Sequence, residues 1–147
     1  MRLGPLGPLP IVVSPLRRTR ETAAPLERRW SAGRVEPAVG EIPTPSHIPF
    51  ASRGEWLRSV MTGTWSDVDP GLRGWRDSVL GALATLPQSA VVVSHFVAIN
   101  AAVGAATADD RVISFSPDHC SVTVVDLDAG RLRLVERGAE GAAARPM

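Results

Sequence analysis

The chain has 147 residues, of which 44% are hydrophobic and 21% charged, and its formal net charge is +1. This length and composition fit one globular domain over residues 1–147 with a core of its own. The near-neutral charge gives no reason to expect nucleic acid or a membrane surface as a partner. A single cysteine, Cys120, excludes an internal disulfide and a cysteine-based metal cluster, so a cytoplasmic location fits best.

The first element is expected directly after an irregular, Pro- and Gly-rich lead-in over residues 1–10. Ile11-Val12-Val13 is too short and too β-branched for a helix and predicts a buried strand. Ser14 is expected to cap the helix that follows, with Pro15 as its first residue. Apolar residues then recur at helical spacing as far as Trp30, so one face of this helix should pack on the core.

Three arginines, Arg17, Arg18 and Arg20, crowd the predicted start of this helix. The helix dipole already places about half a positive charge there, so the arginines favour an anion such as a phosphate or carboxylate at this point. The alternative is a set of solvated arginines that pair with Glu21 or Glu27.

The middle of the chain predicts a weak extended segment over 34–39 and an irregular Pro-rich loop over 41–49. Helices are expected over 52–61 and, after the Asp69-Pro70 start signal, as far as Leu86.

A second junction of strand and helix follows at residues 90–95, where Ala90-Val91-Val92-Val93-Ser94-His95 leads into a helix over 96–107. Its continuous apolar run is typical of a strand that is buried on both faces. Strands are then expected over 111–116, 121–126 and 131–136, the last two joined by a hairpin at Asp128-Ala129-Gly130. Residues 138–147 should form a flexible tail.

This order of elements predicts a three-layer α/β/α domain with a mostly parallel central sheet. The carboxyl ends of parallel strands share one edge, and ligands bind at that edge. Ser14, Arg18 and His95 should therefore lie near one another.

The two junctions together resemble the signatures of the histidine phosphatase superfamily, the phosphoglycerate mutase-like proteins. Ser14-Pro15-Leu16-Arg17-Arg18-Thr19-Arg20-Glu21-Thr22 is similar to the family pattern Ser-x-Leu-x-Arg-(small)-x-x-Thr, and Val92-Val93-Ser94-His95 resembles the later Ser-His signature. The resemblance covers roughly residues 11 to 137. It implies that Arg18 clamps the phosphate and that His95 is the second histidine of the pocket, while Arg17 is a weaker phosphate-binding candidate.

The resemblance also implies an acidic residue that protonates the leaving group. Glu41, before the Pro-rich loop, is the best match, and Glu36 is its rival. The family's phosphorylated histidine lies in an Arg-His-Gly signature at the end of its first strand, and this chain has no such sequence. His47 and His119 have neighbours that match neither signature, so we expect both to be structural or surface residues.

The leading hypothesis is therefore a phosphomonoester hydrolase of the histidine phosphatase type, without metal or cofactor, that lacks its nucleophile strand, so that residues 1–147 are inactive or impaired. Either the reading frame begins too late or the chain is a remnant. The alternative is a non-catalytic domain that binds phosphate or a small phosphorylated ligand. Mutase activity is a poorer third option. Unpaired strand edges would favour association, so a homo-oligomer is possible.

Overall fold

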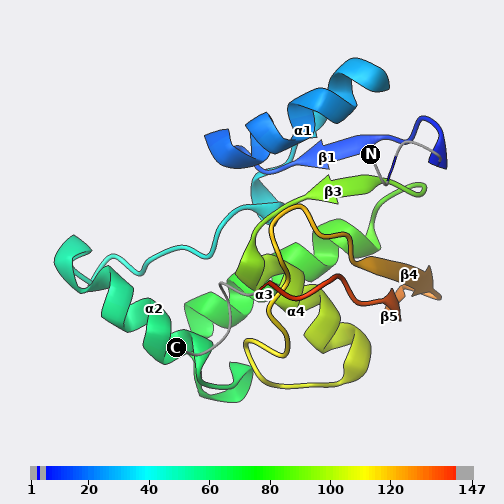
Figure 1. Cartoon of the computed structure of the whole chain (residues 1–147). Coiled ribbons are helices and arrows are strands. Elements are labelled where there is room, and N and C mark those ends of the chain that lie inside the picture. Colours follow the sequence, from blue (N-terminus) through cyan, green and yellow to red (C-terminus); the bar gives the residue numbers. More distant parts are fainter. Residues whose placement is uncertain (1–2, 4–5, 142–147) are drawn as a thin grey trace.

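The computed structural model describes residue 3 and residues 6–141 of the chain, and its elements are shown in Figure 1. Helices and strands alternate through most of the sequence, and a β-hairpin follows them. The elements are β1 (Ile11–Val13), α1 (Arg17–Arg29), β2 (Arg34–Val35), α2 (Arg53–Met61), α3 (Pro70–Ala84), β3 (Val91–Val93), α4 (Phe96–Thr107), β4 (Val124–Asp128) and β5 (Arg131–Glu136).

The central sheet has three strands in the order β2-β1-β3, and all of them are parallel. Ile11 pairs with Val91 and Val13 with both Val93 and Val35, so the three strands end at the same edge. Strands β4 and β5 form a separate antiparallel hairpin. Its turn residues Ala129 and Gly130 have left-handed φ angles of 51° and 79°, as the hairpin signal requires.

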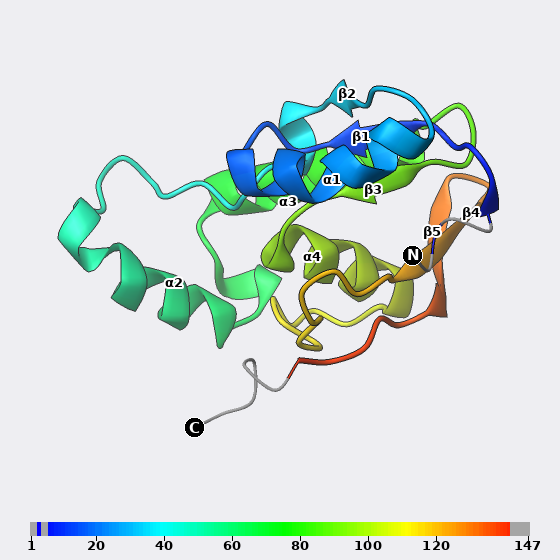
Figure 2. The ribbon, with the colours of Figure 1, turned by 45° about the horizontal axis from the view of Figure 1, so that its top comes forward.

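Helices cover both faces of the central sheet. Ala23 and Leu26 of α1 pack against Ile11 and Val13 on one face, while α3 and α4 lie on the other side (Figures 1 and 2). The predicted mixed α/β fold with a parallel sheet is confirmed. In the part of the chain that the structure describes, none of these helices is long and apolar enough to cross a membrane.

A second core lies away from the sheet and centres on Trp65, which is 2% exposed. It joins residues from α3 and α4 to Ile42, which directly follows Glu41 in the chain. The indole of Trp65 packs against the ring of Trp75 at 6.4 Å between centroids. The Pro-rich loop is thus anchored at its start by a buried side chain.

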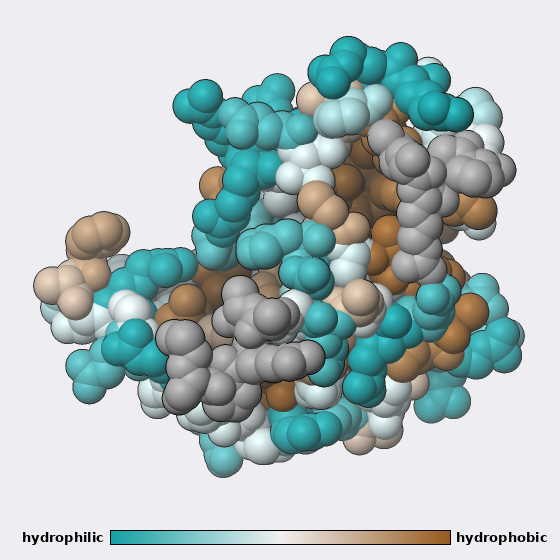
Figure 3. Space-filling model, in the orientation of Figure 1, coloured by the Kyte–Doolittle hydropathy of each residue, from teal (hydrophilic) through white to brown (hydrophobic). Residues whose placement is uncertain are grey.

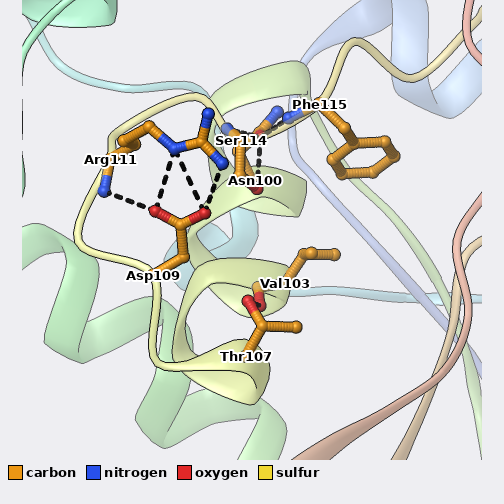
Figure 4. Close-up of polar contacts among 7 residues, drawn as sticks. All are labelled: Asn100, Val103, Thr107, Asp109, Arg111, Ser114 and Phe115. Atoms are coloured by element: carbon orange, nitrogen blue, oxygen red, sulfur yellow. Dashed lines mark hydrogen bonds and ion pairs between the residues drawn. The ribbon is translucent and has the colours of Figure 1, made fainter.

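The prediction of a strand over residues 111–116 is wrong. Two backbone N–H groups of this segment donate to the side chain of Asn100 and not to a neighbouring strand. The Asn100 side-chain oxygen accepts from the backbone N–H groups of Ser114, at 2.8 Å, and Phe115, at 3.2 Å (Figure 4). Asn100 is fully buried in α4, so this segment is bound to the helix and is not part of a sheet. Arg111 meanwhile forms an ion pair with Asp109.

Two further expectations need correction. Leu16, and not Ser14, occupies the cap position of α1, and the Ser14 hydroxyl contacts both His95 and the N–H of Leu16. Strand β3 is half-buried rather than buried on both faces, since it lies at the end of the three-stranded sheet. Part of the tail predicted over 138–147 lies outside the described residues. Of the described part, Gly138 N–H donates to Thr123, and Gly141 N–H donates to the carbonyl of Ser116.

Candidate active site

The candidate site begins where β1 and β3 end side by side. The Ser14 N–H donates to the carbonyl of Val93 at 3.0 Å, which continues the strand pairing by one residue. The next residues therefore meet, and the Ser14 Oγ lies 2.7 Å from His95 Nε2. Ser14 is fully buried and His95 is 7% exposed. Because Nε2 contacts Ser14, the other ring nitrogen, Nδ1, is left to face the site.

Arg18 reaches the same point from the first turn of α1. The Thr19 hydroxyl donates to the carbonyls of Ser14, at 3.1 Å, and Leu16, at 2.7 Å, which fixes the helix start to the strand end. Arg18 Nη2 then lies 3.4 Å from His95 Nδ1. Arginine can only donate, so this contact requires Nδ1 to accept and places the ring proton on Nε2, toward Ser14.

Glu41 completes the cluster, with its Oε1 atom 2.7 Å from Arg18 Nη2. A hydrogen bond of 2.6 Å from the Ser94 hydroxyl to the carbonyl of Val39 ties the end of β3 to the turn before Glu41. Burial of Ile42 holds the chain on the other side of Glu41. The carboxylate is therefore positioned by one fixed contact on each side.

Glu36 has a different environment. Its carboxylate accepts from the Ala38 N–H at 3.2 Å and pairs with Arg34 at 3.1 Å, so it caps the 3₁₀ turn over Pro37–Val39. The Ala38 N–H and the charge of Arg34 lower the pKa of this carboxyl. The side-chain contacts of Glu36 are thus with its own turn and with Arg34, and none of the described contacts joins it to Arg18 or His95.

The pKa of His95 is lowered from its usual range, first by burial and then by the positive charge of Arg18, while Glu41 acts in the opposite direction. These effects favour the neutral imidazole in the free protein. An anion held by Arg18 would oppose both lowering effects and favour the imidazolium ion.

We expect a pH titration followed by NMR to place the His95 pKa below 6.5 in the free chain and higher when phosphate is bound. Since the folded-state pKa lies below the unfolded value, His95 adds stability that is present above pH 6.5 and is lost as the pH falls through the folded pKa. The free energy of unfolding should thus fall less between pH 7 and 5 in His95→Gln than in the wild type. A free-chain pKa above 6.5 would contradict the geometry described here.

The other predicted candidates lie elsewhere. Arg17 pairs with Glu21 at 2.8 Å, and its side chain is 91% exposed, so the structure does not bring it to His95. His47 and His119 are both exposed. Within residues 3 and 6–141, no three His, Cys, Asp or Glu side chains gather closely enough to hold a metal ion.

Sequence reasoning missed Arg53, the first residue of α2. Its Nη2 lies 3.9 Å from the same Glu41 oxygen that Arg18 contacts, and its Nε donates to the Thr44 hydroxyl at 2.8 Å. No periodic pattern or motif marks this arginine, and only the path of the Pro-rich loop brings it back to Glu41. The cluster thus offers two guanidinium groups, a carboxyl and an imidazole, which can bind an anion and exchange protons with it.

No protein-family model and no curated protein matches the sequence. Solved structures do match. A mycobacterial glucosyl-3-phosphoglycerate phosphatase in complex with VO3 is 25% identical over 95% of this chain and 80% of its own, with a TM-score of 0.66. A phosphoglycerate mutase from Thermus thermophilus is 25% identical over 95% of this chain and 79% of its own, with a TM-score of 0.53.

Both neighbours are phosphoglycerate mutase-like histidine phosphatases. The likeness extends over nearly all of this chain. The chain therefore has the fold of the phosphoglycerate mutase-like histidine phosphatases, as its two signatures predicted.

Proposed function

We propose that the chain forms the core of a phosphomonoester hydrolase of the histidine phosphatase type, with a small phosphorylated molecule as substrate. The observation that carries the proposal is the cluster of Arg18, His95 and Glu41 at the carboxyl edge of a parallel sheet. Ligands of open α/β sheets bind at this edge. The fold of the neighbouring phosphatases supports the same function.

Each member of the cluster has a chemical role in this proposal. The Arg18 guanidinium binds the non-bridging oxygens of the phosphate, for which its planar donors are well matched. His95, protonated when the anion binds, donates to the same group. Glu41 protonates the leaving oxygen as general acid. Arg18 Nη2 lies 3.4 Å from His95 Nδ1 and 2.7 Å from Glu41 Oε1, so the three side chains can contact one phosphate ester.

The 147 residues contain no Arg-His-Gly sequence, which in this family carries the attacking histidine. We therefore propose that residues 1–147 alone bind phosphate but do not hydrolyse its esters at a useful rate. A strand that carries this histidine could pair with β3. Among the described strands, β3 pairs only with β1, so its other edge is open.

The orientation of β3 suits this pairing. The Val91 N–H donates to the carbonyl of Pro10, directly before β1, and the Val93 carbonyl accepts from the N–H of Ser14, directly after β1. The N–H and carbonyl of Val92 therefore point to the open edge. Figure 3 shows hydrophobic side chains gathered between the central sheet and the β4–β5 hairpin. A parallel strand added at this edge would end next to His95, where the attacking group is needed.

The absence of an Arg-His-Gly sequence also favours a second candidate function, a non-catalytic domain that binds a phosphorylated ligand. The same cluster would recognise the phosphate, and the exposed positions of His47 and His119 offer no replacement nucleophile. The two functions share the binding site and differ in whether a covalent step follows.

Titration calorimetry with inorganic phosphate tests the shared site. We expect Arg18→Ala to weaken binding about 10- to 100-fold, because hydrogen bonds to charged groups contribute roughly 1.5–3 kcal/mol. Arg17→Ala is the matched control, one residue away with its side chain paired to Glu21, and should bind as the wild type does. Equal affinities for wild type and Arg18→Ala would contradict both candidate functions.

A further inference from the structure

Glu41 lies between two arginines that come from different elements. Arg18 of α1 is 2.7 Å from its Oε1 atom and Arg53 of α2 is 3.9 Å from that same atom. The first distance is that of a charge-assisted hydrogen bond, whereas the second is an ion pair without a hydrogen bond. In the free protein Glu41 therefore holds the arginine to which the proposed function assigns the phosphate.

This contact competes with phosphate binding. Arg18 Nη2 already contacts both Glu41 and His95 Nδ1, so an anion seated between Arg18 and His95 competes with Glu41 for this nitrogen. A carboxylate and a phosphate that share one guanidinium also repel each other. Phosphate binding at this nitrogen is therefore expected to displace the Glu41 carboxylate from Arg18.

Arg53 is well placed to receive the carboxylate. Its Nε is fixed to the Thr44 hydroxyl, and its side chain is 32% exposed, so the guanidinium is held in position. Among the described ion pairs Glu41 is its only acidic partner, and its Nη atoms have no hydrogen bond to any described residue. A shift on the order of 1 Å would turn the 3.9 Å contact into a hydrogen bond.

We propose that Arg53 is a positioning residue that takes over the Glu41 carboxylate when Arg18 binds phosphate. The inference rests on the proposed phosphate site and adds that Glu41 changes its partner from Arg18 to Arg53. Arg53 acts through Glu41 and does not touch the phosphate. It keeps the carboxyl of Glu41 beside the ester while leaving Arg18 free for the anion.

A double-mutant cycle with inorganic phosphate tests this exchange, using calorimetry on the 147-residue chain. Arg53→Gln should weaken phosphate binding roughly three- to tenfold, because Glu41 then stays on Arg18. Glu41→Gln should strengthen binding by a similar factor, because the competing charge is gone. In the Glu41→Gln background, Arg53→Gln should have no further effect.

The controls separate the possible failures. Arg58→Gln, exposed on the same helix, should bind as the wild type does, and Arg53→Lys, which keeps the charge, should retain most of the affinity. An effect of Arg53→Gln that persists without Glu41 would show direct contact with phosphate and overturn the inference. Unchanged binding in Arg53→Gln would overturn it as well. Unchanged binding in Arg18→Ala would instead contradict the proposed function itself.

Discussion

A protein in which a Val- and Leu-rich strand ending in Arg-His-Gly precedes residues 1–147 is expected to hydrolyse p-nitrophenyl phosphate, whereas residues 1–147 alone are not. The difference in kcat should be on the order of 10³-fold or more, because loss of the attacking group in a covalent mechanism leaves only positioning and electrostatic stabilisation. The physical basis is the open edge of β3, which would bring the new histidine next to His95.

Rate assays on both proteins measure this effect, and chemical trapping identifies the intermediate. A phosphohistidine should be stable in alkali and lost in acid. The matched control extends the chain by the same strand with Arg-Gln-Gly at its end, which should restore the strand pairing but not the activity. Robust hydrolysis by residues 1–147 alone, abolished by His95→Ala, would show that His95 is the nucleophile and that the proposed mechanism is wrong.

The largest loss of stability is expected for Trp65→Ala, at about 3–5 kcal/mol of the free energy of unfolding. Trp65 is 2% exposed, packs against Trp75 and lies 5.3 Å below the guanidinium of Arg76. A domain of this size has a stability of roughly 5–15 kcal/mol, so the variant would be close to unfolding. Because Ile42 belongs to the same core, loosening it would also release Glu41 from the site.

Urea denaturation checks this prediction with two control variants. Trp65→Phe should lose less than about 1.5 kcal/mol, because it keeps most of the ring volume and removes an indole N–H. That N–H is buried and has no hydrogen-bond partner among the described residues. Phe50→Ala, at a side chain that is 91% exposed, should change little. A Trp65→Ala variant as stable as the wild type would show that this core contributes little.

The two junctions of strand and helix were determined by the sequence alone. A β-branched run fits a strand, and the apolar spacing after it fits a helix, so both local choices agree with the fold. Parallel order then places the strand ends at one edge, which is enough to bring Arg18 and His95 together. The hairpin at Asp128 followed in the same way from turn residues that tolerate a positive φ.

The partners of several polar side chains depend on contacts between distant segments, and only the tertiary structure decided them. Buried polar groups take the partners that packing offers. The Asn100 side chain therefore binds the N–H groups of Ser114 and Phe115, where a strand was expected, and the Ser14 hydroxyl contacts His95. Arg17 and Arg18 are successive residues of a helix with 3.6 residues per turn, so they point in different directions, and packing placed Glu41 beside Arg18 while Arg17 pairs with Glu21. Arg53 joined Glu41 through the path of an irregular loop, for which local sequence carries no periodic signal.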